Sequence, residues 1–379
     1  MHTDAPQSPP HLPDARPFID SLLHRALSLS ASDIHLEPTA AGLDVKLRID
    51  GLLQTIEQLP PDLGRGAVLR LMVLAQLLTY RLDIPQEGRV RTAINNQPID
   101  LRLAIMPVAH GLRAVVRLPA DLTQPKSLDE LALPDRVLAG LKKFARSDSG
   151  EGGGGGMLLV TGPAGSGKTT TIYALLSHLA ATNPGLSIIS LEDPVERLIP
   201  GITQIEVTPH GQLTYDRALQ SILRQDPQVL MLGEIRNAAT ASLAIQAALT
   251  GHRLIATLHA GDPATAIARL LEMGIEPYQL TSTLFAVLTQ RLVRKRTVPA
   301  PQDSGLKTQV YKGRVPLAEF ATLTPDLRSA ILKHADADAL RTILKNSPTH
   351  QTLRQSAETL VTTGITDTPE IHRVLGDTI

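Results

Sequence analysis

The chain contains no cysteine and no tryptophan, and aromatic residues make up only 2% of its 379 residues. Without cysteine, disulfide bonds, thiol nucleophiles and thiolate metal sites are excluded. Because aromatic rings are so scarce, a platform that stacks nucleic-acid bases and an aromatic ligand cage are both disfavoured. Direct binding of nucleic acid is therefore not expected.

The chain also lacks an excess of charge of either sign and any long apolar run. Lysine plus arginine and aspartate plus glutamate both total 37, so net charge gives no long-range field toward nucleic acid or an anionic membrane. No apolar run reaches the roughly 18 to 20 residues that span a bilayer, and residues 1–17 lack the layout of a signal peptide. With 42% apolar and 20% charged residues, we expect an ordinary globular protein of the cytoplasm.

Residues 18–119 carry the pattern of a small α+β domain, which follows a flexible, proline-rich leader at residues 1–17. Apolar residues at three- and four-residue spacing predict helices, and alternating residues predict strands of an antiparallel sheet. Asp50-Gly51 is a hairpin turn signal between two of these strands. The predicted helices cover residues 18–29 and 63–80, and the predicted strands cover residues 43–49, 52–56, 89–94, 99–106 and 112–118.

Residues 157–300 alternate between apolar strand-like runs and helix-like runs, which is the βαβ pattern of a doubly wound α/β sheet. A linker at residues 120–156 precedes them, and its glycine-rich stretch 150–156 indicates an exposed insertion. Residues 301–379 turn helical and polar, which predicts a small α-helical C-terminal subdomain. The predicted strands cover 157–161, 187–191, 229–232 and 254–258, and the predicted helices cover 134–144, 169–181, 215–223, 238–249, 325–334, 337–344 and 349–362.

A glycine-rich motif, GPAGSGKT at residues 162–169, fits the pattern GxxxxGK[ST]. It stands between a buried strand and a helix, where a phosphate-binding loop is needed. Its glycines let successive backbone amides point at a β-phosphate, while Lys168 bridges the β- and γ-phosphates and Thr169 is a ligand of Mg²⁺. We predict that ATP and Mg²⁺ bind at Gly162, Pro163, Ala164, Gly165, Ser166, Gly167, Lys168, Thr169 and Thr170.

Carboxylates follow two of the predicted buried strands. Glu234 comes after strand 229–232 and Glu192 after strand 187–191, so both are expected at the sheet edge that binds the phosphates. Glu234 is the candidate for a metal ligand or for the group that polarises the attacking water. The acidic segment EDPVE, which contains Glu192 and Glu196, either orients water and metal-bound groups or is simply solvated.

Two histidines occur in the same part of the chain. His252 follows Thr250-Gly251, and His259 closes the predicted strand 254–258. Either is a candidate for a hydrogen bond to the γ-phosphate, and a structural role is the alternative for each.

Further motifs follow in a fixed order: LEDPVE at residues 191–196, LRQDPQVLMLGEIRN at 223–237, TGHRLIATLHAGD at 250–262 and QRLVR at 290–294. With the glycine-rich loop, they resemble the P-loop, Asp box, Walker B segment and His box of the secretion-motor ATPases, the assembly ATPases of type II secretion systems and type IV pili. SDIHLEP, RIDG and PQEGR, between residues 32 and 89, are similar to signatures of the family's N-terminal domain. GRVPLAEF at 313–320 resembles the start of its C-terminal region.

This resemblance implies a RecA-like ATPase domain after a PAS-like N-terminal domain, and a homohexameric ring. It also implies that arginines of the N-terminal domain complete the ATP site, and Arg102 and Arg117 match the family's paired arginines. A guanidinium there stabilises the charge on the transferred phosphoryl group. From the residues alone, a solvent-facing position on a strand is the alternative, and Arg113 is a weaker candidate.

The sequence departs from the family in three respects. Gln228 and Asn237 stand where the Walker B segment usually has aspartate, but Glu234 and Arg236 are retained, so we expect hydrolysis. The four-cysteine zinc module that is common in the assembly ATPases is missing, so no zinc is expected. The seventeen leader residues are too few for the N-terminal docking domain that these ATPases often carry.

The resemblance implies a motor that hydrolyses ATP to assemble a type II secretion pseudopilus or a type IV pilus through an inner-membrane platform protein. Such a motor works at the inner face of the inner membrane and associates with it peripherally, through protein partners. Two alternatives stay open. One is a pilus retraction or DNA-uptake ATPase of the same superfamily, and the other is a nucleotide-gated scaffold with little hydrolysis, motivated by Gln228 and Asn237.

Overall fold

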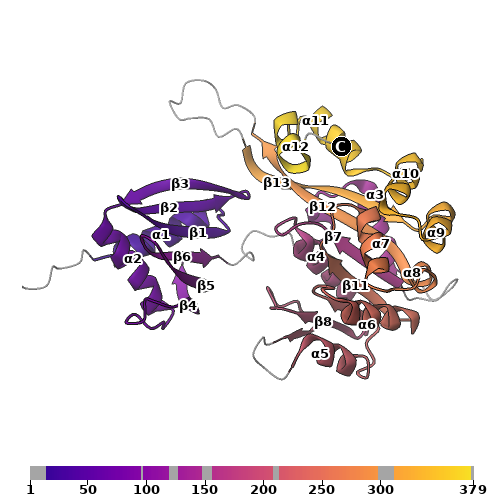
Figure 1. The fold of residues 1–379 in the computed structure, drawn as a ribbon, viewed down its shortest axis with the longest axis horizontal. Coiled ribbons are helices and arrows are strands. Elements are labelled where there is room, and N and C mark those ends of the chain that lie inside the picture. Colours follow the sequence, from indigo (N-terminus) through magenta and orange to yellow (C-terminus); the bar gives the residue numbers. More distant parts are fainter. Residues whose placement is uncertain are drawn as a thin grey trace, which may run out of the picture. The chain divides into compact units, whose positions relative to one another are not determined.

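A computed structural model describes residues 14–94, 97–118, 127–146, 156–207, 213–297 and 311–376 of the chain. The chain divides into two compact units, Met1–Thr123 and Gln124–Ile379, and Figure 1 colours them along the sequence. Residues 1–13 of the predicted leader, residues 120–126 of the predicted linker and the glycine-rich residues 150–155 lie outside the described part. Within the described ranges, no helix is long and apolar enough to cross a membrane.

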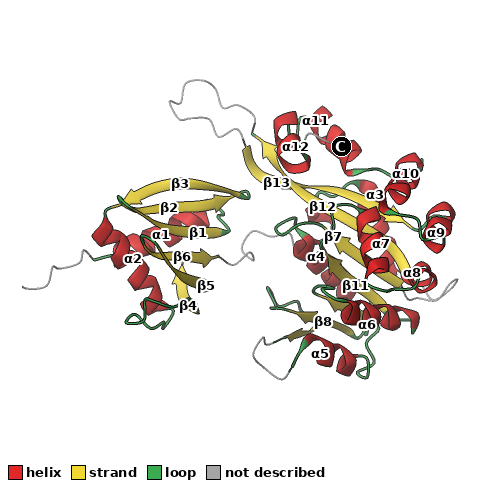
Figure 2. Ribbon diagram, in the orientation of Figure 1, coloured by secondary structure: helices red, strands yellow, loops and turns green. Residues whose placement is uncertain are grey.

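The first unit is a six-stranded antiparallel sheet in the order β3-β2-β1-β6-β5-β4, with helices α1 and α2 packed on one face (Figure 2). Its elements are α1 (Arg16–Ser28), β1 (Asp33–Thr39), β2 (Gly42–Ile49), β3 (Leu52–Leu59), α2 (Pro61–Leu74), β4 (Gln86–Ile94), β5 (Gln97–Val108) and β6 (Gly111–Arg117). The predicted α+β fold is thus confirmed.

Alternation along the strands separates a core face from a polar face. In β2 the residues Leu43, Val45 and Leu47 are buried and the residues between them are half-buried. The buried side chains join Leu22 of α1 and Leu71 of α2 in a single apolar cluster. The polar face is left to charged side chains, as is usual for an antiparallel sheet that is covered on one side.

The second unit is built on a seven-stranded sheet in the order β13-β12-β7-β11-β10-β8-β9, parallel except for β13, which runs antiparallel to β12. Its strands are β7 (Gly156–Thr161), β8 (Ile188–Glu192), β9 (Thr203–Glu206), β10 (Val229–Leu232), β11 (Arg253–Leu258), β12 (Leu284–Arg296) and β13 (Tyr311–Thr322). Its helices are η2 (Asp129–Leu131), α3 (Asp135–Arg146), α4 (Lys168–Thr182), α5 (Tyr215–Ile222), α6 (Ala238–Leu249), α7 (Pro263–Glu272), α8 (Pro277–Thr283), α9 (Pro325–Leu332), α10 (Ala337–Asn346), α11 (Leu353–Thr362) and α12 (Thr368–Leu375).

Helices cover both faces of this sheet. In β7, Leu158 and Val160 pack into a cluster with α3 and α4, while Met157 and Leu159 pack into another with α6, α7 and α8. Because both faces are buried, the parallel strands appear in the sequence as continuous apolar runs rather than as alternating ones. The prediction of a doubly wound α/β sheet is therefore confirmed.

Two long strands were missed by the sequence analysis. β12 carries the charged run RLVRKR, and β13 opens the segment that was predicted to be helical and contains Pro316. Helices α9 to α12 follow β13, and α9, α10 and α11 correspond to the three helices predicted there. Ten paired positions between β12 and β13 join this segment to the sheet. The sequence did not predict β12 because its charged residues interrupt both patterns that indicate a strand, the alternation of apolar and polar residues and the continuous apolar run.

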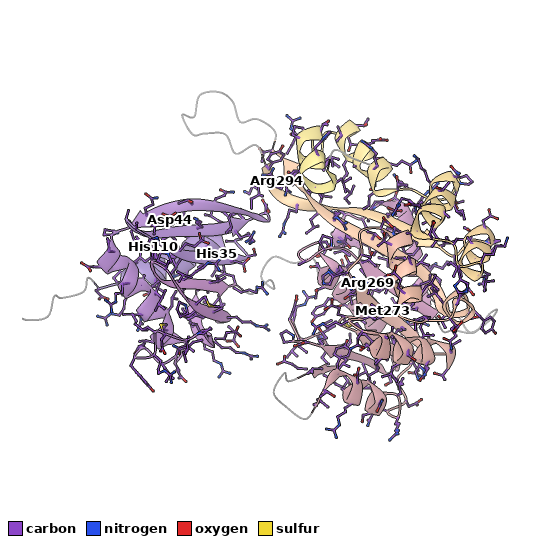
Figure 3. All side chains as sticks on the ribbon, in the orientation of Figure 1. His35, Asp44, His110, Arg269, Met273 and Arg294 are labelled. Carbon is purple, nitrogen blue, oxygen red and sulfur yellow. The ribbon has the colours of Figure 1, made fainter. Side chains whose placement is uncertain are left out.

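A buried ion-pair cluster attaches α12 to the end of β12. Glu370 is 1% exposed and accepts hydrogen bonds from Arg294 Nε at 2.9 Å and from Arg373 Nε at 2.7 Å. The Arg294 guanidinium, on β12 (Figure 3), also lies 4.0 Å from the ring centre of Tyr311. Burial alone raises the pKa of Glu370, but the bonds from Arg373 and Arg294 outweigh it and lower the pKa to about 2.

Candidate functional site

The glycine-rich loop connects β7 to α4, as predicted, and three of its glycines have positive φ: Gly162 (144°), Gly165 (72°) and Gly167 (88°). A side chain at Gly162 would place its Cβ 2.4 Å from the carbonyl oxygen of Gln290, and one at Gly167 would place it 2.7 Å from Gln290 Nε2. Backbone of this kind, which turns its amides inward at a helix N-terminus, is a nest for an anion.

Two polar side chains in the loop have the arrangement that a phosphate site needs. Lys168 Nζ donates to the carbonyl oxygens of Gly162 at 2.8 Å and Pro163 at 2.9 Å, so the ammonium lies within the loop. Burial lowers the pKa of Lys168, and the nearby Glu234 carboxylate opposes that shift. The Ser166 hydroxyl is buried without a hydrogen-bond partner among the described residues. A buried polar atom without a partner usually indicates a missing ligand or water. These residues therefore fit a bound phosphate chain.

Carboxylates meet at the edge of the sheet where β7 ends. Because β8, β10 and β11 run parallel to β7, the residues that follow them lie at the same edge as the P-loop. There Glu234 receives a hydrogen bond from Arg236 Nε at 2.7 Å and lies 3.2 Å from His259 Nε2. Arg236 also reaches Asp193, at 3.2 Å. The side chain of Glu234 remains 24% exposed, so this network is open to a ligand.

Glu192 has a different environment, although it lies at the same edge. It is only 3% exposed and accepts hydrogen bonds from Ser190 Oγ at 2.5 Å, from Gln204 Nε2 at 3.1 Å and from the hydroxyl of Tyr173. Burial, with that bond to Glu192, raises the pKa of Tyr173 above its usual range. The Tyr173 oxygen in turn accepts from the backbone amide of Glu196 at 3.1 Å. Glu192 thus holds α4 and the segment after β8 together.

The loop after β11 carries His259 and is held by two arginines that the sequence analysis did not select. Arg269 of α7 (Figure 3) donates to the carbonyl oxygen of His259 at 2.6 Å. Arg291 of β12 donates to the carbonyl oxygens of Gly261 at 3.0 Å and Gln290 at 3.1 Å. Burial lowers the pKa of Arg291, and the charge of Arg291 helps to lower the pKa of Lys168. The motif QRLVR was the only feature of the sequence that pointed to Arg291.

The structure does not bring His252, a candidate for a hydrogen bond to the γ-phosphate, to the P-loop of its own chain. His252 precedes β11 and His259 follows it, so the two lie at opposite ends of this strand. The carbonyl oxygen of His252 accepts from the amide of Gly156, at the start of β7, whereas the P-loop follows the end of β7. The His252 ring contacts Thr250 and Ala247, each at 2.9 Å, which is a structural role.

The two positions that depart from the family's Walker B pattern have structural roles. Gln228 precedes β10 and accepts a hydrogen bond from the amide of Ser187 at 2.6 Å, at the sheet edge away from the P-loop. Asn237 caps the N-terminus of α6 by accepting from the amide of Thr240 at 2.8 Å. Asparagine and aspartate are about equally good at this capping position.

Arg102 and Arg117 lie in the first unit and are direct cross-strand partners on β5 and β6. Both are exposed, on the polar face of the sheet. Arg113 lies on the same strand as Arg117 but pairs with Glu37, at 3.3 Å, and with His35, at 3.1 Å.

The chain is similar in sequence to proteins of secretion and pilus systems. Type II secretion system protein HxcR of Pseudomonas aeruginosa is 37% identical over 370 residues, which cover 95% of this chain and 77% of that protein. Type IV pilus assembly ATPase PilB of Thermus thermophilus is 34% identical over 386 residues, which cover 94% of this chain and 42% of that protein.

Two solved structures have the same fold. The pilus retraction motor PilT with bound ADP matches with a TM-score of 0.66 at 25% identity and covers 94% of this chain and 96% of that one. The ATPase DotB of Legionella pneumophila matches with a TM-score of 0.75 at 21% identity and covers 96% of each chain. The second unit accordingly has the RecA-like fold that the resemblance implied. The family described as type II/IV secretion system protein matches residues 13–373, and the chain belongs to that family.

Proposed function

We propose that this ATPase uses ATP hydrolysis to assemble a type II secretion pseudopilus or a type IV pilus through an inner-membrane platform protein. The observation that supports the proposal most is the meeting of the P-loop with the Glu234, Arg236 and Asp193 network at one sheet edge. The relatives at 34% and 37% identity are named as a pilus assembly ATPase and a type II secretion protein. We place the protein at the cytoplasmic face of the inner membrane, attached peripherally through protein partners and without direct contact to nucleic acid.

In this proposal the P-loop holds the triphosphate. Backbone amides of residues 164–169 and the helix dipole of α4 stabilise the phosphate charge, and Lys168 moves from the carbonyl oxygens of Gly162 and Pro163 to the β- and γ-phosphates. Thr169 and Glu234 would hold Mg²⁺, directly or through water. When bound, the ion neutralises charge on the phosphates and lowers the barrier to attack.

Glu234 is also our first candidate for orienting the attacking water, because its carboxylate is partly exposed and sits next to His259. Glu192 is assigned to positioning, since three donors already occupy its buried carboxylate. His259 would donate to the γ-phosphate or to Glu234, and Arg269 fixes the loop that carries it.

The experiment that tests the enzyme is phosphate release by the purified chain with Mg²⁺. Lys168→Ala and Glu234→Gln should each reduce the rate by about 100-fold or more, because each removes charge from the site of phosphoryl transfer. Glu192→Gln should reduce the rate less than Glu234→Gln and should also lower the melting temperature. A larger rate loss for Glu192→Gln, with unchanged stability, would transfer the water-orienting role to Glu192.

We further propose that the chain works as a homohexamer in which Arg102 and Arg117 of one subunit complete the ATP site of its neighbour. Arginine suits this task because its guanidinium carries a permanent charge and several donors. Arg117→Ala subunits mixed into wild-type rings should lower activity more than their fraction of the ring predicts. A loss in simple proportion to that fraction would argue against a role across the subunit interface.

A retraction or DNA-uptake motor is the second candidate, and the likeness to a pilus retraction motor favours it over others. Expression in a secretion strain that lacks its own assembly ATPase separates the two, because only an assembly motor restores export of the secreted proteins. Gln228 and Asn237 give the nucleotide-gated scaffold little support, because both side chains make structural hydrogen bonds, Gln228 with the amide of Ser187 and Asn237 with the amide of Thr240. Wild-type phosphate release no higher than that of Lys168→Ala would bring it back.

A further inference from the structure

A row of charged residues crosses the polar face of the first unit's sheet. Successive cross-strand partners along this row are Arg89 with Arg102, Arg102 with Arg117, Arg117 with Asp33, and Asp33 with Arg48. Direct partners on neighbouring antiparallel strands have Cβ atoms about 4.5–5.5 Å apart and share one face. The row therefore holds four arginines and one carboxylate, and the carboxylate of Asp33 lies between Arg117 and Arg48.

Asp33 differs from the arginines in its burial. Its residue is 8% exposed, whereas the side chain of Arg117 is 73% exposed and that of Arg48 is 34% exposed. The carboxylate accepts from Arg117 Nε at 3.4 Å, lies 3.3 Å from Arg48 Nε, and is fixed by a 2.8 Å hydrogen bond from the Ser32 hydroxyl. Asp33 is thus a buried negative charge beside positive charges that are more exposed.

We propose that Asp33 is a positioning residue for Arg117. The carboxylate takes the Nε side of the guanidinium, which leaves the far end of this flat group, with its terminal nitrogens, turned outward on the exposed side chain. The inference rests on the proposed role of Arg117 at a neighbouring subunit's ATP site and deepens it. Asp33 itself touches no phosphate.

The physical reason is that an arginine side chain has many rotamers and loses entropy when it is held in one of them. Asp33 reduces that loss before ATP binds, and it offsets the repulsion between Arg117 and its cationic partner Arg102. Without the carboxylate, Arg117 keeps its charge but samples positions away from the phosphates. The chemical step should then slow, while nucleotide binding at the P-loop of the second unit should not weaken.

A purely structural role is the competing explanation, since Asp33 also binds Arg48 and the Ser32 hydroxyl. The two explanations differ in how Asp33 and Arg117 combine. A positioning residue has no further effect once its target is removed, because it acts only through that target. A structural residue lowers activity and stability whether or not Arg117 is present.

The test is a double-mutant cycle with Asp33→Asn, Arg117→Ala and the double variant in the full-length chain, measured by steady-state phosphate release. We expect Asp33→Asn to lower kcat about tenfold with the KM for ATP within about twofold of wild type. In the Arg117→Ala background it should lower kcat no further. Asp44→Asn is the matched control and should leave kcat unchanged, because Asp44 lies on the same unit (Figure 3) but contacts Gln58 and Lys46 instead of Arg117.

The outcomes separate this inference from the proposal beneath it. If Arg117→Ala leaves kcat unchanged, the proposed role of Arg117 fails, and this inference fails with it. If Arg117→Ala lowers kcat but Asp33→Asn does not, or if the two effects simply multiply, the inference alone is overturned. If Asp33→Asn does not fold, the same double-mutant cycle is measured in an Arg48→Gln background. There, removal of the positive charge of Arg48 offsets the loss of the Asp33 carboxylate.

Discussion

The hydroxyls of Ser166 and Ser190 are both buried, but they differ in hydrogen bonding. Ser190 donates to the buried Glu192 at 2.5 Å, whereas the buried Ser166 hydroxyl has no partner among the described residues. A buried hydrogen bond stabilises a protein by about 1 kcal/mol, and a buried group left without one costs about 1–3 kcal/mol. The two side chains therefore contribute to folding with opposite signs.

Replacing each serine with alanine exposes that difference. Ser166→Ala should weaken ADP binding by about tenfold without lowering the free energy of unfolding, because it removes a hydroxyl that only a ligand satisfies. Ser190→Ala should lower the free energy of unfolding by about 1–2 kcal/mol and leave ADP affinity nearly unchanged. Calorimetric titration and urea denaturation measure both quantities. A loss of stability in Ser166→Ala would mean that its hydroxyl already has a partner.

The positions of some single residues in the fold could be predicted from the sequence, and those of others could not. The spacing and context of the P-loop were enough to identify Lys168, and the position of Glu234 after an apolar strand was enough to predict its sheet edge. The chain direction alone separates His252 from His259, because a residue before a parallel strand lies at the sheet edge opposite to a residue after it. Arg291 was missed because a basic residue in a sequence usually predicts a solvent-exposed side chain, and its partner Gly261 is 30 residues away in the sequence.

At the scale of elements, α12 is joined to β12 largely by charge. Glu370 is nearly inaccessible and is paired with Arg294 and Arg373, so removing its charge leaves two cations without a counter-charge. Breaking one side of a buried pair is more damaging than replacing the whole pair. The contact lies near the end of β12, beyond the point where Gln290 of that strand passes the P-loop.

Glu370→Gln should lower the free energy of unfolding by about 3 kcal/mol at neutral pH. The pKa of Glu370 is lowered from 4.5 to about 2 on folding, so its stabilisation is complete above about pH 4.5 and is lost as the pH falls toward 2. The difference between wild type and variant should therefore shrink in urea denaturation at pH 3. The exposed Glu358→Gln on α11 is the control, and a difference that grows toward acid would contradict this account.

Four parallel strands of the second unit that were predicted differ in burial from the two long strands that were missed. β7, β8, β10 and β11 were predicted because every one of their residues is buried, which gives continuous apolar runs. β12 and β13 were missed because they combine buried centres with charged or proline-containing segments whose partners lie on α12, in the His259 loop and on α11. Such partners follow from the folded arrangement and not from a local pattern.

At the scale of the whole molecule, the two units have separate apolar cores, so ligand binding to one need not stabilise the other. ADP lacks the γ-phosphate that we assign to Arg102 and Arg117. ADP at about 100 times its dissociation constant stabilises the state that binds it by about 2.7 kcal/mol. We expect this stabilisation to stay in the second unit.

Hydrogen exchange of the dilute full-length chain measures it segment by segment. Exchange in β7 and α4 should slow on adding ADP, while exchange in β1 to β6 should be unchanged, and Lys168→Ala should abolish the slowing. Equal slowing in both units would show that they open as one cooperative body. The sequence could predict the two units from their different periodicities, but not whether they unfold together.

Gln290 contacts the P-loop and the start of α4 at several positions, although it is more than 100 residues away from them in the sequence. The positions for a Cβ at Gly162 and Gly167 both fall against Gln290, and its side-chain oxygen accepts from Thr171 at 2.8 Å. The conformation of GPAGSGKT therefore depends on packing against Gln290 of the adjacent strand. In another protein without a matching residue on that strand, we expect the loop to lose this conformation. Redesign of this loop has to change residues 162, 167, 171 and 290 together, and natural variation at 290 should be accompanied by change in the loop.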